Sequence, residues 1–540
     1  MIPSLSLSRR LPLCLLTLAA MGVSSFPSLL WAEEKAGPGT EYDGVKVVNS
    51  DPVPTEEPLP VRIVVDETRV VKPFDREIFG INYDWEATQP SFISPLNPVI
   101  DPAPVEMLMK GIKFPLNRVA GSDSQVIDFK KSIGPVESRP GQKLWPWSPG
   151  KPLLFGPVEL FSWLRKVDPD SHISYTVNLH QPAEETGDIA EFLVGDAKAT
   201  KPDGAVNWAA KRAEYGMPDP VPVAIWELGS EIDFGRGANH WTVDRYIKAA
   251  KAVIPLIRAV DPNAKFAMGA ITAPWGGTGE GQPPWRNWHQ TILKEMGGDL
   301  AYITFHPYYY GFPVSSIDGY LDQISQDINA AGYKGKIKIY NSEHAVWPSM
   351  PADGKWEKMW FMTHSLGGCL GTSLIYGRWL NRPDVGPAAY HAFSAGPWWM
   401  ISRQRKTERL HTSGIAELFR LLSKIEGENV VQSEAQGALT DVRKPDLQFD
   451  TAAIRRADGT LQLFIANRGG PRTADFSLGK DYAIADSCQL TSTGGMSSVN
   501  TPDEQPITVK DGVYPADETK SLGKLDLPAR SVTLLTLKKR

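Results

Sequence analysis

The chain has 540 residues, 42% of them hydrophobic and 10% aromatic, which is enough for two or three domains with large cores. Its 57 basic and 62 acidic residues give a formal charge of -5 without a long run of one sign, which excludes a disordered chain and argues against a nucleic-acid partner. Three cysteines (Cys14, Cys369 and Cys488) are too few for a disulfide scaffold and lack paired metal-ligand spacing, so we expect neither a metal nor another cofactor.

The N-terminus has the pattern of a secretory signal peptide. Two arginines precede an apolar run over residues 11–21, and Ala32 is a small residue suited to cleavage. We therefore expect residues 1–32 to be removed during export to the periplasm or the outside of the cell. A membrane anchor is the alternative, but the run is shorter than the ~20 apolar residues of a span, and no later segment qualifies. Residues 33–60, rich in Pro, Gly and acidic side chains, are predicted to be a flexible linker.

Between residues 78 and 430, short apolar runs alternate with helical or irregular stretches. Eight such runs predict a parallel sheet covered by helices, and eight strands close a (β/α)8 TIM barrel. A helix expected over residues 243–260 exemplifies the connecting elements. A doubly wound sheet is the rival fold, but no Gly-rich nucleotide turn follows the first run. The eight predicted strands are Ile78–Tyr83, Ile112–Val119, Ile173–Leu179, Val221–Leu228, Lys265–Ile271, Tyr302–His306, Ile337–Tyr340 and Leu370–Ile375.

The C-terminal region has the alternation of antiparallel strands. Residues 451–456 and 461–466 flank the turn Ala457-Asp458-Gly459, which predicts a β-hairpin. We expect residues 431–540 to form a β-sandwich domain. One or more strands from residues 61–77, where Val, Ile and Thr alternate with charges, are expected to complete it.

Two glutamates lie directly after predicted strands, where a parallel barrel carries its chemistry. Glu231 follows the fourth predicted strand, and Glu343 follows the seventh. A retaining glycosidase needs such a pair about 5–5.5 Å apart, one carboxyl protonated for the leaving oxygen and one ionised to attack the anomeric carbon. Two surface carboxylates beside strands are the alternative, because spacing in the sequence does not give the distance between the side chains.

Several segments resemble the α-L-arabinofuranosidases of glycoside hydrolase family 51, and in order they cover most of residues 61–430. The resemblance implies a (β/α)8 barrel with a β-sandwich, retaining chemistry on an oligo- or polysaccharide, and a homo-oligomer. It also implies that Glu231 is the acid/base and Glu343 the nucleophile. The segments are RVAGS (118–122), SIGPVESRP (132–140), NL (178–179), WAAKRAEYG (208–216), WELGSE (226–231), HPYY (306–309) and SEHAVW (342–347).

Other side chains near predicted strand ends are candidates for substrate binding. His306, close to Tyr308, can bind a carboxylate or a sugar hydroxyl, or be a satisfied core histidine. Asp84 follows the first strand and can bind sugar hydroxyls; Glu86 is an equally good neighbour, and a helix cap is the alternative. Arg118 can orient a carboxylate through a bidentate pair, or form an ion pair of the barrel.

Aromatic and small polar residues complete the candidate set. Trp347, Trp398 and Trp399 can stack on sugar faces, with simple packing as the alternative. Ser230 stands where the family usually has an Asn that hydrogen-bonds the sugar, and Ser122 stands where many members have another Asn. Such changes around an intact glutamate pair suggest conserved chemistry with changed specificity, but a non-catalytic descendant would show them too.

The sequence therefore predicts an exported, retaining glycoside hydrolase, an exo-acting α-L-arabinofuranosidase-like enzyme for plant or algal polysaccharide. One alternative is a glycosidase of the same clan with another sugar specificity, for a glucan or a glucuronide. The other alternative is a non-catalytic secreted carbohydrate-binding protein on a degenerate barrel.

Overall fold

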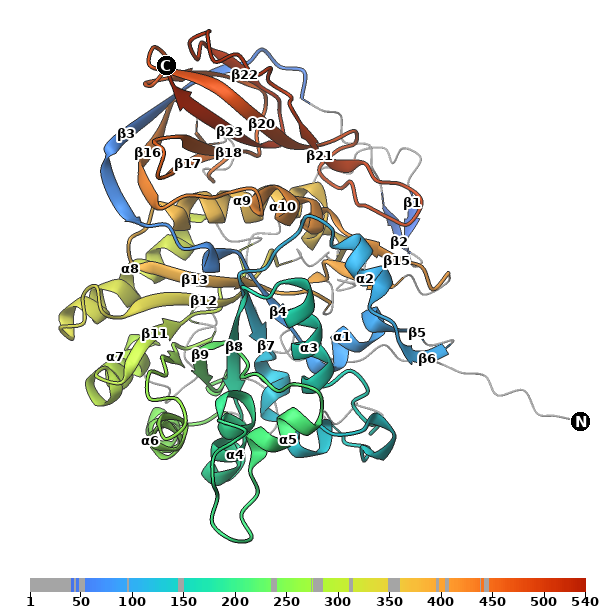
Figure 1. Cartoon of the computed structure of the whole chain (residues 1–540). Helices are drawn as coiled ribbons and strands as arrows, with labels where there is room; N and C mark the ends of the chain where they lie inside the picture. The colour runs from blue at the N-terminus through green and yellow to red at the C-terminus, as the bar shows by residue number, and fades with distance from the viewer. Residues whose placement is uncertain are drawn as a thin grey trace, which may run out of the picture.

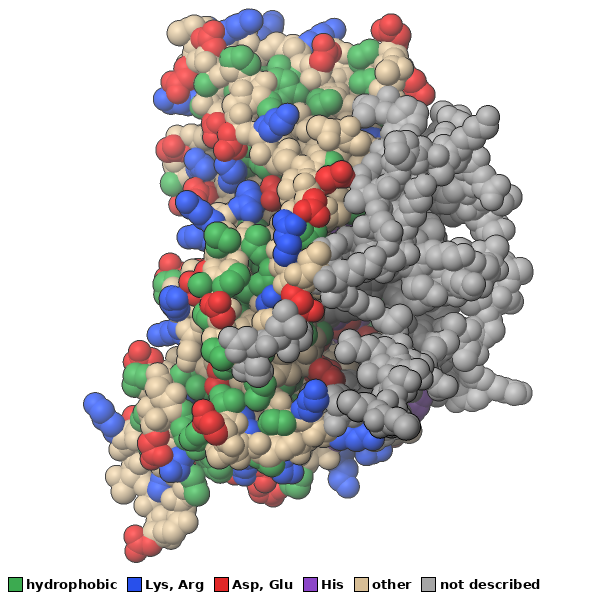
Figure 2. Space-filling view, turned by 90° about the vertical axis from the view of Figure 1, so that its right-hand side faces the viewer, with side chains coloured by type: hydrophobic (Ala, Val, Ile, Leu, Met, Phe, Trp, Pro, Cys, Tyr) green, Lys and Arg blue, Asp and Glu red, His purple; other side chains and the backbone are tan. Residues whose placement is uncertain are grey.

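The computed structural model describes residues 40–42, 45–47, 54–94, 97–143, 150–234, 240–272, 274, 285–309, 314–347, 360–394, 398–403, 407–437, 439–440 and 446–540. The predicted signal peptide and most of the predicted linker lie outside these residues. None of the described helices combines the length and the apolar content that a membrane span requires. On the described part of the face in Figure 2, acidic and basic side chains are interspersed.

Eight parallel strands form a closed barrel with helices around it, which confirms the predicted TIM barrel (Figure 1). The strands are short runs of mostly buried residues, because helices cover the outside of the barrel and side chains fill its inside. In order around the barrel they are β4 (Gly80–Tyr83), β7 (Leu116–Val119), β8 (His172–Val177), β9 (Val223–Leu228), β10 (Phe266–Gly269), β11 (Leu300–Thr304), β12 (Lys338–His344) and β13 (Val385–Tyr390).

The helices are amphipathic where they cover the barrel. The predicted helix at residues 243–260 is α6 (Val243–Arg258), which buries Tyr246, Ala250 and Ile257 on one face. The Thr242 side chain caps its start by accepting a hydrogen bond from the Arg245 N–H. The other helices are α1 (Trp85–Phe92), α2 (Ala103–Leu108), α3 (Pro157–Val167), α4 (Ala183–Val194), α5 (Trp208–Glu214), α7 (Trp285–Met296), α8 (Val314–Ala330), α9 (Leu366–Leu380) and α10 (Gly414–Leu422).

One predicted strand is wrong. Residues 370–375 lie inside α9, and the eighth strand of the barrel is β13 instead. Almost every residue of α9 is buried, because the helix lies between the barrel and a second sheet (Figure 1). A helix that is covered on all sides has no polar stripe, so a short window of it cannot be distinguished from a buried strand.

The second sheet has nine strands in the order β21-β20-β23-β18-β17-β16-β3-β19-β22 and is the predicted second domain. Its N-terminal contribution is β3, which pairs antiparallel with β16, and the predicted hairpin is confirmed by the pairing of β17 with β18. One face holds Leu463 and Leu535 in the sheet's own core, whereas Ile454 and Phe464 on the other face join the core shared with the barrel.

The domain boundaries that we drew in the sequence stay predictions. The strands of this sheet are β3 (Leu59–Pro73), β16 (Asn429–Gly437), β17 (Phe449–Arg455), β18 (Leu461–Asn467), β19 (Arg472–Phe476), β20 (Tyr482–Ser492), β21 (Ile507–Asp511), β22 (Leu525–Leu527) and β23 (Ser531–Lys539). Three small pairs are β1 (Thr40–Tyr42) with β2 (Val45–Val47), β5 (Ile93–Ser94) with β6 (Asn97–Ile100), and β14 (Ile401–Arg403) with β15 (Leu410–Thr412).

Candidate active site

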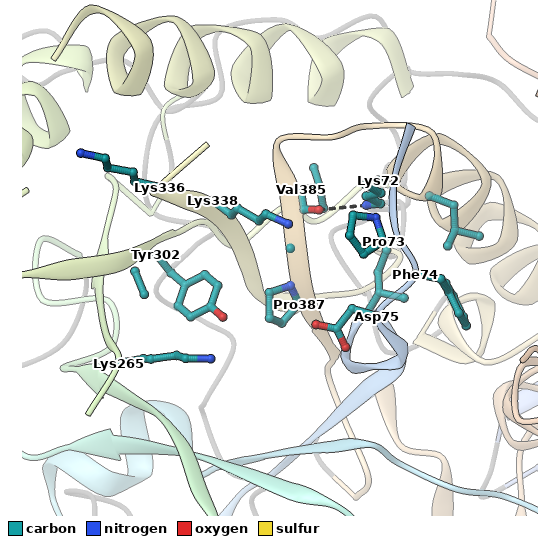
Figure 3. A pocket seen from close by; sticks show the side chains of 14 residues that line it. Lys72, Pro73, Phe74, Asp75, Lys265, Tyr302, Lys336, Lys338, Val385 and Pro387 are labelled. Carbon is teal, nitrogen blue, oxygen red and sulfur yellow. Dashed lines mark hydrogen bonds between the residues drawn. The ribbon is translucent and has the colours of Figure 1, made fainter. Parts of the chain in front are cut away.

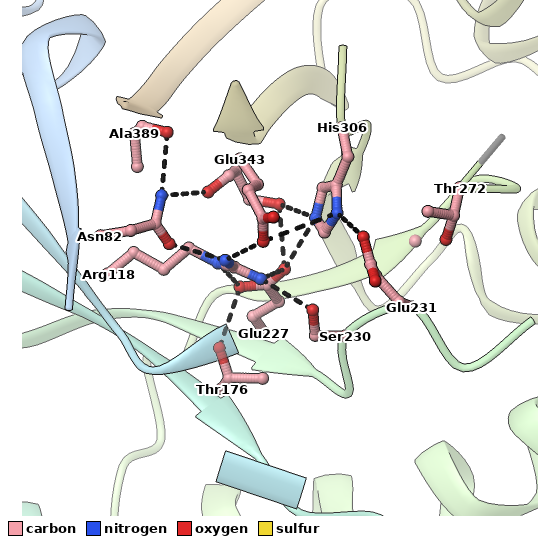
Figure 4. Close-up of polar contacts among 12 residues, drawn as sticks. Asn82, Arg118, Thr176, Glu227, Ser230, Glu231, Thr272, His306, Glu343 and Ala389 are labelled. Carbon is pink, nitrogen blue, oxygen red and sulfur yellow. Dashed lines mark hydrogen bonds and ion pairs between the residues drawn. The ribbon is translucent and has the colours of Figure 1, made fainter. Parts of the chain in front are cut away.

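The two candidate glutamates meet at the carboxyl end of the barrel (Figure 4). Glu343 is near the end of β12, and Glu231 lies three residues beyond β9 with its backbone in the left-handed region, at φ 51°. A carboxylate oxygen of Glu231 and one of Glu343 lie within 4.8 Å of each other. This separation matches the spacing of a retaining pair, about 5–5.5 Å, and is too small for the water that an inverting pair must admit.

Arg118 on β7 is the centre of the site, and its guanidinium forms five hydrogen bonds. It forms a bidentate pair with Glu227, through Nε to Oε2 at 2.6 Å and Nη2 to Oε1 at 3.0 Å. Nη1 donates to Asn82 Oδ1 at 2.6 Å and to Glu343 Oε2 at 3.0 Å, and Nη2 also donates to Ser230 Oγ at 3.0 Å. Burial opposes the charge, but the carboxylates outweigh it and raise the pKa of Arg118. The predicted bidentate pair exists, and its carboxylate belongs to Glu227.

The backbone comes close to this guanidinium at Gly121, which has φ 54°. A Cβ atom at this position would lie 3.2 Å from Nη1 of Arg118 and 3.7 Å from Oε2 of Glu343. Glycine therefore suits both the conformation and the space. The next residue, Ser122, is half-buried, and its side chain forms no hydrogen bond with another described residue.

A chain of hydrogen bonds leads from the arginine pair to Glu231. Glu227 is fully buried and also accepts from Thr176 Oγ1 at 3.2 Å and from Ser342 Oγ at 3.0 Å. Ser342 Oγ lies 3.0 Å from Nε2 of His306, and Nδ1 of the same ring lies 3.0 Å from Oε1 of Glu231. The predicted contact of His306 with a carboxylate is therefore present, and the histidine is held at both ring nitrogens.

The surrounding charges shift the pKa values of Glu343 and His306 in opposite directions. Burial raises the pKa of Glu343, but the nearby His391, His306 and Arg118 and a hydrogen bond from the Tyr308 hydroxyl outweigh it, so the pKa lies well below the usual value. Burial lowers the pKa of His306, but the two candidate glutamates outweigh this effect and raise it. Glu343 is therefore an ionised carboxylate at neutral pH, and its neighbour His306 holds a proton more readily than an ordinary histidine.

A group of aromatic rings lies beside Glu343. The Tyr308 ring lies 5.5 Å from Trp347 and 5.3 Å from Trp398, measured between ring centroids. Trp399 does not reach this group, because its ring packs against two histidines elsewhere. Two of the three predicted stacking residues, Trp347 and Trp398, therefore lie beside the site.

Asp84 is the first candidate in the chain and lies at the N-cap position of α1. Its side chain forms no capping hydrogen bond, so the alternative role as a helix cap does not hold. Burial raises its pKa, Asp123 and Glu343 raise it further, and Arg118 opposes them. Asp84 therefore interacts with the charges of the glutamate site, whereas Glu86 lies in the first turn of α1, where its N–H donates to Asp123.

Sequence reasoning missed Asn82, Glu227, Ser342 and His391. Asn82 donates to the carbonyl oxygens of Ser342 and Ala389, at 3.0 and 2.9 Å, and so ties β4 to β12 and β13. His391 directly follows β13, with Nδ1 buried, without a hydrogen-bond partner among the described residues, and 3.9 Å from Oε1 of Glu343. A charged residue such as Glu227 inside an apolar strand was an available signal, because a buried charge needs a partner.

Three side chains of the site have the spacing of a metal site. Glu231, His306 and Glu343 each offer one ligand atom, and these atoms lie within 4.8 Å of one another. The Arg118 guanidinium is already hydrogen-bonded to Glu343, at 3.0 Å, and its positive charge would repel a cation. The donor set therefore suits acid/base and nucleophilic work by the carboxylates better than it suits a metal ion.

Comparison with known proteins finds relatives that are named as arabinofuranosidases. A family model described as the alpha-L-arabinofuranosidase 1 domain matches residues 108–289. An intracellular exo-α-(1→5)-L-arabinofuranosidase from Streptomyces lividans is 24% identical over 63% of this chain and 53% of its own length. A Bacillus subtilis enzyme of the same name, numbered 1, is 26% identical over 46% of this chain and 48% of its own length. The chain thus spans about half the length of these two relatives.

An exo-α-(1→6)-L-arabinofuranosidase from Bifidobacterium longum is 22% identical over 77% of this chain and 84% of its own length. Among solved structures, the α-L-arabinofuranosidase of Thermotoga maritima with arabinose has a TM-score of 0.71 at 20% identity, over 89% of this chain and all of that one. A family 51 enzyme from Bifidobacterium longum has a TM-score of 0.73 at 16% identity, over 89% of this chain and all of that one. These two structures show the fold.

The predicted export is contradicted by this comparison, because the Streptomyces and Bacillus relatives are named as intracellular enzymes. That prediction was based on two arginines, an apolar run and the small residue Ala32 at the N-terminus, all of which lie outside the described residues. The findings confirm the resemblance to the α-L-arabinofuranosidases of glycoside hydrolase family 51.

Proposed function

We propose that this chain, a relative of the family 51 α-L-arabinofuranosidases, is a retaining, exo-acting glycoside hydrolase that removes α-L-arabinofuranosyl groups from oligo- or polysaccharides. The observation that carries the proposal is the glutamate pair, Glu231 and Glu343, with carboxylate oxygens within 4.8 Å at the carboxyl end of the barrel. The names of the relatives support the sugar, and those named as intracellular support action inside the cell.

In this proposal Glu343 is the nucleophile. Its lowered pKa keeps it ionised, and Arg118 and the Tyr308 hydroxyl hold its two oxygens in place. A bond forms from a Glu343 oxygen to the anomeric carbon as the bond to the leaving oxygen breaks, and Glu231 gives that oxygen a proton. Glu231 then takes a proton from water, which displaces Glu343 and releases the sugar with its original anomeric configuration.

The hydrogen bonds around His306 account for the proton that Glu231 needs. Ser342 donates its single hydroxyl proton to the Glu227 carboxylate, so its oxygen must accept from Nε2–H of His306. One proton is then left for the 3.0 Å contact between Nδ1 of His306 and Oε1 of Glu231. It belongs either to an imidazolium that faces a carboxylate or to a carboxylic acid that faces a neutral ring. We propose that this shared proton is the one delivered to the leaving group.

Substrate contacts are expected to differ from those of the family. Ser230 is buried, and its Oγ accepts a hydrogen bond from Arg118, so it is engaged below the site rather than directed at a sugar. We propose that Asp84, His391 and Ser122 meet sugar hydroxyls and that Trp347 packs on a sugar face. Because Ser230 is engaged by Arg118, the contact with the sugar that Asn makes in the family is missing here. This supports a second candidate, a glycosidase of the same clan for another sugar.

A panel of aryl glycosides that includes the α-L-arabinofuranoside tests the proposal. The wild type should release the aryl group from the arabinofuranoside, and Glu343→Ala should lose about 10⁴-fold or more of the activity while keeping its circular dichroism spectrum. Glu434→Ala, at an exposed position of the second sheet, is the matched control and should stay active. Full activity in Glu343→Ala would overturn the role of Glu343. Activity on another glycoside alone would favour the second candidate, and oligosaccharide binding without hydrolysis would favour a binding protein.

A further inference from the structure

A second cavity, of about 260 Å³, lies at the opposite end of the barrel (Figure 3). Its walls come from the amino ends of β11, β12 and β13, from Lys265 just before β10, and from the end of β3 where the chain passes from the second sheet to the barrel. Both active-site glutamates lie at the opposite end, near the carboxyl ends of β9 and β12. The cavity is therefore separate from the proposed hydrolytic site.

Lysine side chains give this cavity its character. Lys72 is buried, and its Nζ donates to the carbonyl oxygens of Trp379 and Val385 at 2.8 and 2.9 Å, which uses two of its three N–H groups. In Figure 3 the Lys338 side chain extends toward Lys72 and Val385, and Lys265 extends beneath the Tyr302 ring. Within the described part of the chain, the side chains of Lys265 and Lys338 form no ion pair or hydrogen bond.

Among the described residues that line the cavity, a single one is acidic. It is Asp75, whose Oδ1 accepts the N–H of Glu77 at 2.9 Å, and the Tyr302 hydroxyl points to the same side of the cavity (Figure 3). Lys336 also lines the cavity, but its ammonium points away from the other lysines in the same view. Three ammonium groups therefore surround a concave space with one carboxylate.

The burial and the neighbouring positive charges shift the pKa of Lys72. Burial and then the charge of Lys338 lower the pKa of Lys72 to about 7, with Arg382 acting in the same direction and Asp384 and Asp75 opposing them. Like charges gathered in a partly enclosed space repel one another. An anion placed between the lysines would replace this repulsion with attraction.

We propose that the cavity binds a small phosphorylated sugar or polyol, with its phosphoryl group among Lys72, Lys265 and Lys338. A phosphoryl group has the charge and the acceptor oxygens to satisfy several ammonium groups at once. The Tyr302 hydroxyl can donate to the same group, and the Asp75 carboxylate can accept from ligand hydroxyls. The volume lies just below the about 300 Å³ at which pockets for drug-sized ligands begin, which suits a small metabolite.

The position of the cavity predicts what binding does. Lys72 and Asp75 come from the segment that joins the second sheet to the barrel, and Lys265 and Lys338 come from the barrel. A ligand held by both should stabilise this junction, since a ligand that binds the folded state alone raises the free energy of unfolding. Hydrolysis at the other end of the barrel should not change.

Calorimetry and thermal unfolding of the full chain test the proposal with four probes: inorganic phosphate, ribose 5-phosphate, ribose and glucuronate. Both phosphates should bind and raise the melting temperature, with ribose 5-phosphate tighter if Asp75 contacts hydroxyls. Ribose should have no effect, and sodium chloride at equal ionic strength should not reproduce the shift. If glucuronate binds and neither phosphate does, the ligand carries a carboxylate and not a phosphoryl group, and the proposal is overturned.

Charge-neutralising variants localise the site. Lys265→Gln and Lys338→Gln should each weaken phosphate binding by about tenfold or more, because each removes a charged hydrogen-bond donor. Lys334→Gln, at an exposed lysine outside the cavity, is the matched control and should bind like the wild type. All three should unfold cooperatively and keep their activity on the aryl substrate. No phosphate binding by the wild type at millimolar concentrations, or equal weakening in all three variants, would overturn the proposal.

Discussion

The two ends of one barrel gather opposite charges and satisfy them differently. At the carboxyl end, Arg118 lies among carboxylates, and its guanidinium donates to four side chains of the chain itself. At the amino end, Lys72, Lys265 and Lys338 face one carboxylate, Asp75, and two of these lysines have no partner among the described residues.

The two ends differ in whether a buried or half-buried charge has its partner within the chain. At the carboxyl end, hydrogen bonds fix the charged groups before a substrate arrives, which is the preorganisation that stabilises a transition state. At the amino end, the missing counter-charge points to a partner from outside the chain. A change at the paired end should therefore damage stability or catalysis, whereas a change at the unpaired end should be tolerated.

After Glu343→Ala, the largest effect is expected from Glu231→Ala at the paired end. Arabinofuranosides with poor leaving groups should be slowed by about 10²–10⁴-fold, because their leaving oxygen needs a proton. Activated aryl arabinofuranosides should be slowed far less, because their aryl group leaves without protonation. Measuring kcat/KM against leaving-group pKa checks this, and equal slowing of all substrates would contradict the acid role of Glu231.

Glu227→Gln should cost the most stability. The change leaves Arg118 buried with its main counter-charge removed, so the free energy of unfolding should fall by about 3–5 kcal/mol. Urea unfolding measures the loss. The exposed pair of Glu214 with Lys211 offers the control, since Glu214→Gln should cost less than about 1 kcal/mol. Similar small losses for the two variants would show that Arg118 does not depend on Glu227.

His306→Gln should change the pH dependence of kcat/KM. In the wild type the last proton of the pair leaves with the raised pKa of His306, above the ordinary histidine value, so activity should persist to neutral pH and fall at higher pH. Without the imidazole the proton is held by Glu231 alone, so the alkaline limb should move to lower pH.

A pH profile of each enzyme measures this shift. The control His172→Gln changes an exposed histidine at the amino end of the barrel, and its profile should match the wild type. An alkaline limb that stays in place in His306→Gln would contradict the shared proton.

The smallest effect is expected at the unpaired end. Without ligand, and below the pKa of about 7 of Lys72, Lys338→Gln should raise the free energy of unfolding by up to about 1 kcal/mol, because it removes a like charge near a buried ammonium. Lys334→Gln should leave stability unchanged. A clear loss of stability in Lys338→Gln would mean that Lys338 has a partner and that the two ends do not differ.

Much of the barrel could be predicted because its strands have a distinctive composition. A strand such as β8 is buried on both faces, and the run Ile173–Leu179 that identified it contains no charged residue. The same property misled at α9, which is a helix with an equally apolar surface. Local composition could not separate the two, because the difference lies in what covers the element.

The candidate site could also be predicted only in part. Glu231 and Glu343 could be predicted because each comes just after an apolar run, and a parallel barrel places its chemistry at the carboxyl ends of its strands. The connection through Glu227, Ser342 and His306 could not, because it depends on which strand side chains point inward and meet across the barrel. The role of Ser230 was also open in the sequence, and its hydrogen bond to Arg118 emerges only when β7 and the end of β9 come together.

The stereochemistry of the reaction tests retention by the Glu231 and Glu343 pair most directly. With methanol as acceptor and an aryl α-L-arabinofuranoside as donor, proton NMR identifies the anomer that forms first. Two displacements at one carbon, through Glu343, predict methyl α-L-arabinofuranoside as the product. Formation of the β anomer would mean a single displacement and would contradict Glu343 as the nucleophile.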